Sequence, residues 1–485
     1  MENQTVPLKK LDECHWEIPM DYKRGMRVPG LIFSNERLLK DILKDKALEQ
    51  VANVAMLPGI VKASMAMPDI HWGYGFPVGG VAATDPEQGG VISPGGVGYD
   101  INCGVRLIRS KLTEEEVRPV LQPLVAQLFR DIPCGVGAGG DIKFSRVEEE
   151  KILRDGAGWI VKQGYGVPSD LAHTEANGCL EGAAPEKLSD RAYERGKGQV
   201  GTLGSGNHFL EIQVVDKVFN PAAAQVLGMQ EGEVTVMIHS GSRGLGYQVC
   251  DDYLEETARA CSKYGIDLPD RQLVCAPVNS PEGQDYLGAM RAAANYAWAN
   301  RQLLMHRMRT VFERIFNRPW TALGLSLVYD VAHNIAKMER YEIDGKEKLL
   351  CVHRKGATRA FPAGHPELPE EIRPLGQPVI IPGDMGRNSY LLLGAPQSLT
   401  DSFGSSCHGA GRVMSRTAAV RSAQGRSIRR ELEEKGIIAM ARGRTGLDEE
   451  QPAAYKDVNE VVDVVHEAKL SRRVCRMRPI GVIKG

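Results

Sequence analysis

Helix-forming and strand-forming patterns alternate irregularly along the 485 residues of this chain, and no Pro/Ser-rich linker separates one group from another. A chain of this length could form two or three ordinary domains, but a domain boundary is expected to run through such a linker. The patterns also lack the regular strand–helix–strand order that is typical of parallel sheets. We therefore predict a single large, irregular α+β domain over residues 1–485, built around antiparallel β-sheets with surrounding helices.

Several segments have a clear local signature. Apolar residues recur at helical spacing over residues 34–57 and, at greater length, over residues 281–317. Residues 232–242 alternate as a strand does, and Asp344-Gly345 is typical of a hairpin turn. The stretch from Trp72 to Gly104 contains ten glycines with apolar residues between them, which favours short strands and tight turns over a flexible linker.

Composition excludes several classes of protein. Ten cysteines without a CxxC pair predict reduced thiols in the cytosol, not a disulfide framework or a zinc ribbon. Residues 1–20 lack the apolar core of a signal peptide, and no later stretch is long and apolar enough to cross a bilayer. We therefore expect a cytoplasmic protein with no membrane partner. Because the formal net charge is −1, a polyanion would have to bind a local basic patch.

Metal-capable side chains stand at a predicted strand end or beside a glycine turn in four segments. Asp100 and Cys103 are three residues apart in a glycine-framed turn, so both side chains can converge. Three histidines have similar settings, namely His208, His239 and His333. Each of these residues alone could equally be an ordinary buried group, and spacing cannot close a site from such distant pieces.

The residue types do not decide which metal binds. Thiolate with imidazole favours zinc, whereas an added carboxylate and open positions admit manganese. Five candidate ligands are enough for two ions that share one ligand. Two such ions suit phosphoryl chemistry, because they hold the attacking and leaving oxygens together.

Motifs of the common nucleotide-binding proteins are absent. Neither a P-loop nor the KxDG motif of ordinary nucleotidyl-transferring ligases occurs. Gly135–Gly140 matches GxGxxG, but no helix start follows it, and we interpret it as a turn. A covalent nucleotide adduct would therefore need another nucleophile.

Arginines gather near the C-terminal end of the chain. Residues 409–430 contain six arginines and no acidic residue. Arg412 and Arg416 are one helical turn apart, so we predict that they project from one face of a helix and contact adjacent phosphates. The alternative is a solvated basic helix face. Arg195 and Arg243 would extend the same track or be surface charges.

His408 directly follows Cys407 and directly precedes this arginine segment. Neighbouring residues on an extended chain point to opposite sides, so the two side chains are poorly placed to act as a nucleophile–base pair. An imidazole at the start of an arginine-lined helix suits phosphate chemistry, because the helix N-terminus adds partial positive charge. His408 could be a metal ligand, a partner that activates Cys407 or the reacting group itself. This setting favours the reacting group, with Cys407 as a bystander.

Seven short motifs, in order along essentially the whole chain, resemble those of the RtcB family of RNA-splicing ligases. They are GYDINCGVR, GTLGSGNHFLE, HSGSRGLG, YDVAHN, HRKGATRAFP, PGDMG and SSCHGAGR with the SR that follows it. The resemblance implies an enzyme dependent on GTP and manganese. It would join an RNA end bearing a 2′,3′-cyclic phosphate or 3′-phosphate to a 5′-hydroxyl end, in tRNA splicing or RNA repair. The implied partners are tRNA halves and the small activating protein archease.

The resemblance also implies roles for individual residues. Cys103 would bridge two manganese ions, with Asp100 and His333 completing one site and His208 and His239 the other. His408 would carry GMP on an imidazole nitrogen. The implied nucleotide-binding residues are Asn207, His208, Phe209, Leu210, Glu211, His333, Asn334, Pro382, Gly383, Asp384, Met385, Ser389, His408, Gly409, Ala410, Gly411, Tyr455 and Lys484. The implied RNA-binding residues are Arg195, Arg243, Arg412 and Arg416.

Two rival interpretations are open at this point. A dinuclear-metal cyclic phosphodiesterase or phosphatase would use the metal ions without His408. An RNA-binding protein would use the metals only as structural ions and would not turn over GTP.

Overall fold

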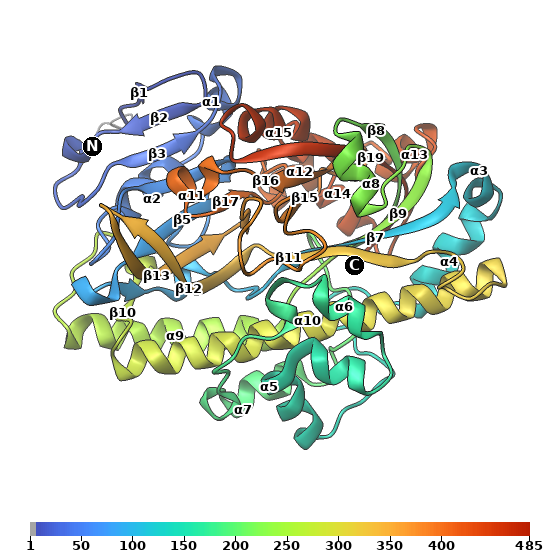
Figure 1. Cartoon of the computed structure of the whole chain (residues 1–485), viewed down its shortest axis with the longest axis horizontal. Coiled ribbons are helices and arrows are strands. Elements are labelled where there is room, and N and C mark those ends of the chain that lie inside the picture. The colour runs from blue at the N-terminus through green and yellow to red at the C-terminus, as the bar shows by residue number, and fades with distance from the viewer. Residues whose placement is uncertain (1–5) are drawn as a thin grey trace.

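A computed structural model describes residues 6–485, so the first five residues of the predicted domain and of the N-terminal stretch lie outside it. Most strands belong to two large, mainly antiparallel sheets (Figure 1). The first sheet has the order β1-β2-β3-β4-β5-β13-β12, and only β3 and β4 pair in parallel within it. Its strands are β1 (Lys9–Lys10), β2 (His15–Ile18), β3 (Gly30–Phe33), β4 (Ser64–His71), β5 (Val78–Thr84), β12 (Asn334–Ile343) and β13 (Lys346–Lys355).

The second sheet has the order β11-β7-β9-β8-β19-β16-β15, and β18 pairs in parallel with β19 at its side. Its strands are β7 (Gly104–Thr113), β8 (Phe209–Val218), β9 (Glu233–Ser240), β11 (Ser326–Ala332), β15 (Pro378–Ile381), β16 (Ser389–Gly394), β18 (Ile438–Ala441) and β19 (Ser471–Lys484). Two short ribbons pair β6 (Val91–Ile92) with β10 (Ala276–Pro277) and β14 (Ala357–Arg359) with β17 (Ser405–Cys407).

Helices surround the sheets, and α9 and α10 run along one side of the molecule with α5 and α7 packed beyond them (Figure 1). In chain order the helices are α1 (Glu36–Ile42), α2 (Ala47–Val54), α3 (Glu114–Val117), α4 (Leu121–Asp131), α5 (Arg146–Lys162), α6 (Pro168–Ala172), α7 (Asp190–Gly196), α8 (Pro221–Leu227), α9 (Arg243–Lys263), α10 (Pro281–Phe316), α11 (Gln397–Ser402), α12 (Arg416–Ser422), α13 (Ile428–Glu434), α14 (Arg444–Glu449) and α15 (Val458–Glu467). This confirms the predicted α+β class with antiparallel sheets and surrounding helices.

Local signatures predicted several elements correctly. The long helix is α10, and β12 and β13 form the hairpin at Asp344-Gly345. Gly135–Gly140 is a turn, as interpreted. The stretch over residues 34–57 forms two helices, α1 and α2, with a turn between them. The side chain of Asp45 in that turn accepts a hydrogen bond from the Trp72 N–H, so a tertiary contact accompanies the break that helical periodicity did not predict.

The second sheet is fixed against the helices by a buried apolar layer. Alternate residues of β8 and β9, among them Leu210 and Ile238, pack in one cluster with Leu304 and Met308 of α10 and with α4. Strands of this sheet come from residues 104 to 484, so no single cut divides its sequence into two compact parts. That arrangement supports the one-domain prediction. Among residues 6–485, no helix has both the length and the apolar character that crossing a membrane requires.

Candidate metal and nucleotide site

Several strand ends meet at one edge of the second sheet. β7 begins opposite the ends of β9 and β11, and β8 begins opposite the ends of β9 and β19. Four of the five predicted metal-binding residues lie one residue from one of these ends, namely Cys103, His208, His239 and His333. Strand pairing therefore brings together side chains that are up to 230 positions apart, from Cys103 to His333.

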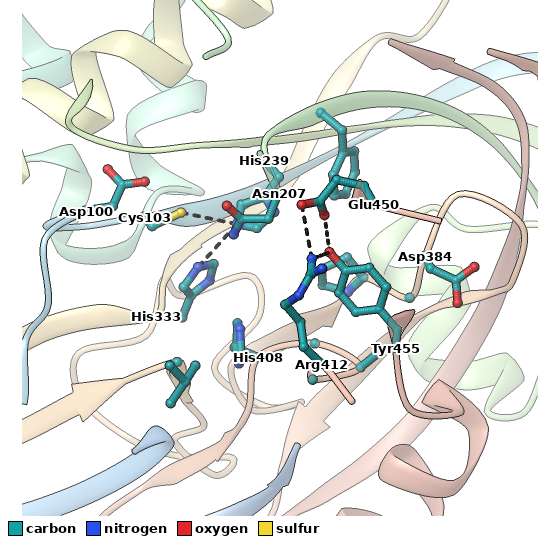
Figure 2. Close-up of a pocket in the computed structure, with 18 of the residues that line it drawn as sticks. Asp100, Cys103, Asn207, His239, His333, Asp384, His408, Arg412, Glu450 and Tyr455 are labelled. Carbon is teal, nitrogen blue, oxygen red and sulfur yellow. Dashed lines mark hydrogen bonds and ion pairs between the residues drawn. The ribbon is translucent and has the colours of Figure 1, made fainter. Parts of the chain in front are cut away.

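Donor atoms of all five predicted ligands converge there, and Figure 2 shows four of these residues, Asp100, Cys103, His239 and His333. Sγ of Cys103 lies 3.4 Å from Nε2 of His208 and 3.2 Å from Nε2 of His239. Nε2 of His239 is 3.2 Å from Nε2 of His333, and Nε2 of His208 is 2.7 Å from Oδ2 of Asp100. By nearness they form two groups, Cys103–His239–His333 and Asp100–Cys103–His208. The family resemblance divides them differently around the same shared Cys103, and that division stays a prediction.

The protonation pattern of this cluster fits a bound cation. Nδ1 of His208 donates a hydrogen bond to the Leu203 carbonyl at 2.9 Å, so Nε2 of the neutral ring is an acceptor. It faces a carboxylate oxygen of Asp100, and two acceptors 2.7 Å apart repel unless a proton or a metal ion lies between them. Burial lowers the pKa of His239 and of His333 well below its usual value, which favours neutral, ligating imidazoles. The residues present therefore fit the metal that the donor set suggests.

A buried guanidinium holds the turn that carries two of these ligands. Arg301 of α10 donates to the carbonyls of Asn102 and Ser240 at 2.7 and 3.0 Å, and it is paired with Asp330 at 2.8 Å. Asn102 itself has a φ of 51°, a left-handed conformation that asparagine tolerates better than most residues. Arg301 thus ties the metal-binding turn to the end of β9.

His408 lies beside this cluster, with its ring 4.8 Å from that of His333 (Figure 2). Its Nδ1 is 2.6 Å from Oδ2 of Asp69, a fully buried carboxylate on β4. The same oxygen accepts the backbone N–H groups of His408 and Gly409 at 3.0 and 3.2 Å. Burial raises the pKa of Asp69, but the neighbouring His408 imidazole outweighs it, and the net shift is downward. An ionised Asp69 fixes the ring and leaves Nε2 as the free nitrogen.

Cys407 takes no part in the site. It ends β17, is fully buried and packs in the apolar cluster under the first sheet. Burial raises the pKa of its thiol well above the ordinary value, so no thiolate forms near neutral pH. The structure agrees with its interpretation as a bystander.

A cavity of about 270 Å³ opens from the metal cluster and His408. It is lined by most of the predicted nucleotide-binding residues: Asn207, Phe209, Glu211, His333, Asn334, Pro382, Gly383, Asp384, Met385, Ser389, His408, Gly409, Ala410, Gly411, Tyr455 and Lys484. His208 is not part of this lining but belongs to the metal cluster behind it. Leu210 does not line the cavity either, because alternation along β8 turns its side chain into the apolar core. Only the backbone of Leu210 could contact a nucleotide.

The arginines do not form the predicted helix face. α12 begins at Arg416, where the Ser415 side chain caps it by accepting the Ala418 N–H, and Arg412 lies before it in a bridge to Tyr455. The prediction that a helix begins near His408 is therefore wrong. Both arginines nevertheless line the cavity, through tertiary contacts and not helical spacing.

Glu450 explains why the two arginines converge, and sequence reasoning missed it. Its side chain is fully buried and lies 3.1 Å from Arg412, 3.6 Å from Arg416 and 3.6 Å from Lys484. The Tyr455 hydroxyl also donates to it, and Figure 2 shows Arg412, Glu450 and Tyr455 joined in this network. Burial raises the pKa of Glu450, but these cations more than offset it, so the carboxylate stays ionised. Glu450 thus holds four cavity side chains in place.

Two further residues line the cavity although no role was predicted for them. His71 lines the cavity and donates from Nδ1 to the Asp69 carbonyl at 3.1 Å. Burial lowers its pKa to about 3, so its ring stays neutral. Lys355, in the HRKG motif, is buried against the carbonyls of Tyr74 and Phe76, and burial lowers its pKa to about 7.

The two remaining arginines lie outside the cavity lining. Arg243 opens α9 with a φ of 56°; its Nη1 is 3.5 Å from Nδ1 of His208. Arg195 lies in the last turn of α7, and its guanidinium stacks 4.7 Å from the ring of Tyr247. The structure therefore puts Arg243 against the metal cluster and Arg195 further out.

The fold and this site define an α+β enzyme with a buried metal-ligand cluster beside a carboxylate-held histidine. The family model described as tRNA-splicing ligase RtcB matches residues 50–485. A protein named tRNA-splicing ligase RtcB from Thermococcus kodakarensis is 55% identical over 482 residues, covering 99% of this chain and all of that protein. One of the same name from Archaeoglobus fulgidus is 55% identical over 483 residues, covering the whole of both chains.

A bacterial relative extends the similarity. The RNA-splicing ligase RtcB of Mycobacterium tuberculosis is 53% identical over 438 residues, which cover 90% of this chain and all of that protein. The chain belongs to the RtcB family, and the class of enzyme is that of the RNA ligases.

Proposed function

We propose that this protein joins an RNA end bearing a 2′,3′-cyclic phosphate or 3′-phosphate to a 5′-hydroxyl end, using GTP and manganese, through a guanylylated His408. The observation that carries the proposal is the pairing of His408 with Asp69 beside the metal cluster, at the wall of the cavity. Family membership supports the same reaction class. The physiological RNA that we propose is a pair of tRNA halves or a damaged RNA.

Five residues would hold two manganese ions: Asp100, Cys103, His208, His239 and His333. When bound, the ions would neutralise phosphate charge and polarise the phosphorus–oxygen bonds. Cys103 would be shared between them. The thiolate that this requires is disfavoured in the metal-free protein, because burial raises the pKa of Cys103 well above its usual value.

His408 would act as the nucleophile of the first step. Its Nε2 lone pair attacks the α-phosphorus of GTP, the bond from that phosphorus to the bridging oxygen breaks, and pyrophosphate leaves. The ring then carries GMP as a phosphoramidate and gains positive charge. Asp69, 2.6 Å from Nδ1, stabilises that charge and keeps the ring oriented.

The RNA would react in two further steps. An oxygen of the RNA 3′-phosphate attacks the phosphorus of the bound GMP, the phosphorus–nitrogen bond breaks, and RNA-3′-ppG forms. A cyclic phosphate is first opened by water. The 5′-hydroxyl oxygen then attacks the RNA phosphorus and GMP leaves. Arg412 and Arg416, held by Glu450, would offset negative charge on the phosphoryl oxygens.

A joining assay tests this proposal. The protein would be incubated with a 5′-hydroxyl RNA, an RNA bearing either 3′ end, GTP and manganese. We expect a joined product that requires GTP. Hydrolysis of the cyclic phosphate without joining would favour a cyclic phosphodiesterase, and RNA binding without GTP turnover would favour a binding protein. Repeating the assay with archease tests that proposed partner. Ten free cysteines in the described chain fit our proposed cytoplasmic location.

The affinity for guanine nucleotide should rise with pH because of Glu211. Burial raises the pKa of this carboxyl to about 8, so it is mostly protonated in the free protein at pH 7. A guanine edge offers N–H donors, which only the ionised form accepts with both oxygens. Binding should therefore release a proton, and the Kd should fall by up to tenfold per pH unit as pH rises toward about 8.

Titration calorimetry with GMP between about pH 7 and 8.5, above the second phosphate pKa of about 6, checks this expectation. Repeating the titration in buffers of different ionisation enthalpy gives the number of protons that binding releases. In Glu211→Gln the pH dependence should vanish, although binding itself weakens. A Kd that does not change with pH in the unsubstituted protein would show that Glu211 does not accept the guanine edge as a carboxylate.

A further inference from the structure

A second hollow, of about 600 Å³, lies near the proposed active site and is rich in arginine. It is bounded by the end of α4, the C-terminal half of α10 and the loop that follows α4 (Figure 1). Four arginines line it: Arg130, Arg307, Arg314 and Arg442. Two aspartates, Asp131 and Asp141, also face it. The lining therefore carries an excess of positive charge, and no role proposed above uses it.

Two of these cations are only partly neutralised. Arg442 is exposed, and no carboxylate of residues 6–485 lies within ion-pair distance of it. Arg307 is only 11% exposed, and its Nε has no hydrogen-bond partner in the described part of the chain. It pairs with Asp141, but that side chain is 76% exposed, so solvent weakens the pair. Because solvent screens that pair, Arg307 still contributes positive charge to the wall of the hollow.

One glycine-rich segment, residues 198–206, contacts residues beside the hollow and residues of the active site. On the side of the hollow, Gly140 N–H donates to the Gly198 carbonyl and Gly135 N–H to the Gly204 carbonyl, at 2.7 and 2.8 Å. A Cβ atom at Gly201 would lie 3.3 Å from Nε of Arg307. The loop after α4 therefore rests on this segment, with Arg307 against it.

Arginines of the proposed RNA track touch the same segment. A Cβ atom at Gly204 would lie 2.3 Å from Arg243, and one at Gly206 would lie 2.6 Å from Arg416. Arg442 is placed by β18, whose last residue pairs with Lys484, and Lys484 lines the nucleotide cavity. The hollow is thus next to the cavity, with cations bordering the backbone between them.

We propose that this hollow binds backbone phosphates of an RNA strand whose end lies in the active site. This inference rests on the proposed function, because it extends the binding surface for the same RNA substrate beyond the active site. Guanidinium groups bind phosphates well, and the lining has no tyrosine, tryptophan or phenylalanine on which a base could stack. The contact should therefore depend on strand length and salt and not on base sequence.

Charge reversal at Arg442 tests the proposal without disturbing the fold, because this side chain is exposed and lacks an acidic partner in the described residues. The matched control is Arg24→Glu, an exposed arginine at the opposite, N-terminal part of the chain. Joining would be measured with a series of RNA strands, from a few nucleotides to a full tRNA half, extended on either the 3′-phosphate or the 5′-hydroxyl side. Labelling of the protein by GTP without RNA would be measured in parallel.

For Arg442→Glu we expect KM to rise on the order of tenfold for long strands extended on one of the two sides. The slope of log KM against log salt concentration should fall by about one, which corresponds to the loss of one phosphate contact. KM for the shortest strands and labelling by GTP should match those of Arg24→Glu. An unchanged KM at every length on both sides would overturn the proposal.

Direct binding of long and short RNA, followed by fluorescence anisotropy without GTP or manganese, separates this proposal from the proposed function. Should the protein fail to join RNA, weaker binding of long RNA by Arg442→Glu would still support the hollow as a phosphate site. Equal binding by both variants would refute it.

Discussion

Replacing His408 with alanine should abolish RNA joining and the covalent labelling of the protein by GTP, with a loss of at least about a thousandfold in rate. The expectation follows from the geometry of this residue. Asp69 holds Nδ1 at 2.6 Å, Nε2 is left free, and the ring lies 4.8 Å from that of His333 in the metal cluster. The other nitrogen side chains of the described cavity lining are placed differently. His71 has only a backbone carbonyl, and no carboxylate, at Nδ1. Lys355 is held by two carbonyls and Lys484 pairs with Glu450, while His239 and His333 belong to the metal cluster.

The measurement is incubation with manganese and GTP labelled on the α-phosphate, followed by denaturing electrophoresis. The adduct should be labile to acid and stable to alkali, as a phosphoramidate is. Cys407→Ala is the matched control, because Cys407 is the chain neighbour of His408 but lies fully buried. It should keep the label. A label that persists in His408→Ala would show that another residue carries the nucleotide.

Replacing Cys103 with alanine should remove most of the bound manganese. Its Sγ lies within 3.4 Å of two histidine nitrogens, and it belongs to both groups of donor atoms in the cluster. Loss of a shared ligand weakens the binding of both ions, whichever way Asp100, His208, His239 and His333 are divided between them. Metal content after desalting, measured by mass spectrometry of the elements, should fall from two per chain to well below one.

Cys475→Ala provides the control for this variant, because Cys475 is an equally buried cysteine in the core of the second sheet. Thermal unfolding of both variants without metal should show similar destabilisation, since each removes one buried sulfur. Metal occupancy near two in Cys103→Ala would refute the shared role. Because metal content is measured without an activity assay, the result reports directly on metal binding at this site.

Elements with a local signature could be predicted from the sequence, but their assembly could not. Periodicity and the Asp344-Gly345 turn were sufficient for α10 and for the β12–β13 hairpin. The alignment of strand ends that brings Cys103 next to His333 depends on pairing between β7 and β11, more than 200 positions apart. Register between such distant strands is set by burial and tertiary contacts, which single-sequence patterns do not contain.

The residues that the predicted site lacked share a physical reason. Asp69 sits inside a buried strand, and Glu450 follows another glutamate in what looks like an acidic surface turn. Each matters only through partners far along the chain, at His408 and Arg412. The helix start at Arg416 was predictable, because Ser415 is a typical N-cap residue.

The most direct test of the central claim is to locate the covalent nucleotide. The protein would be incubated with GTP and manganese without RNA, digested at alkaline pH, and analysed by tandem mass spectrometry. We predict one modified peptide, with GMP on the imidazole of His408, and loss of the modification when RNA with a 3′-phosphate is added. GMP on Lys355, Lys484 or any other residue, or no covalent nucleotide in protein that joins RNA, would contradict the account.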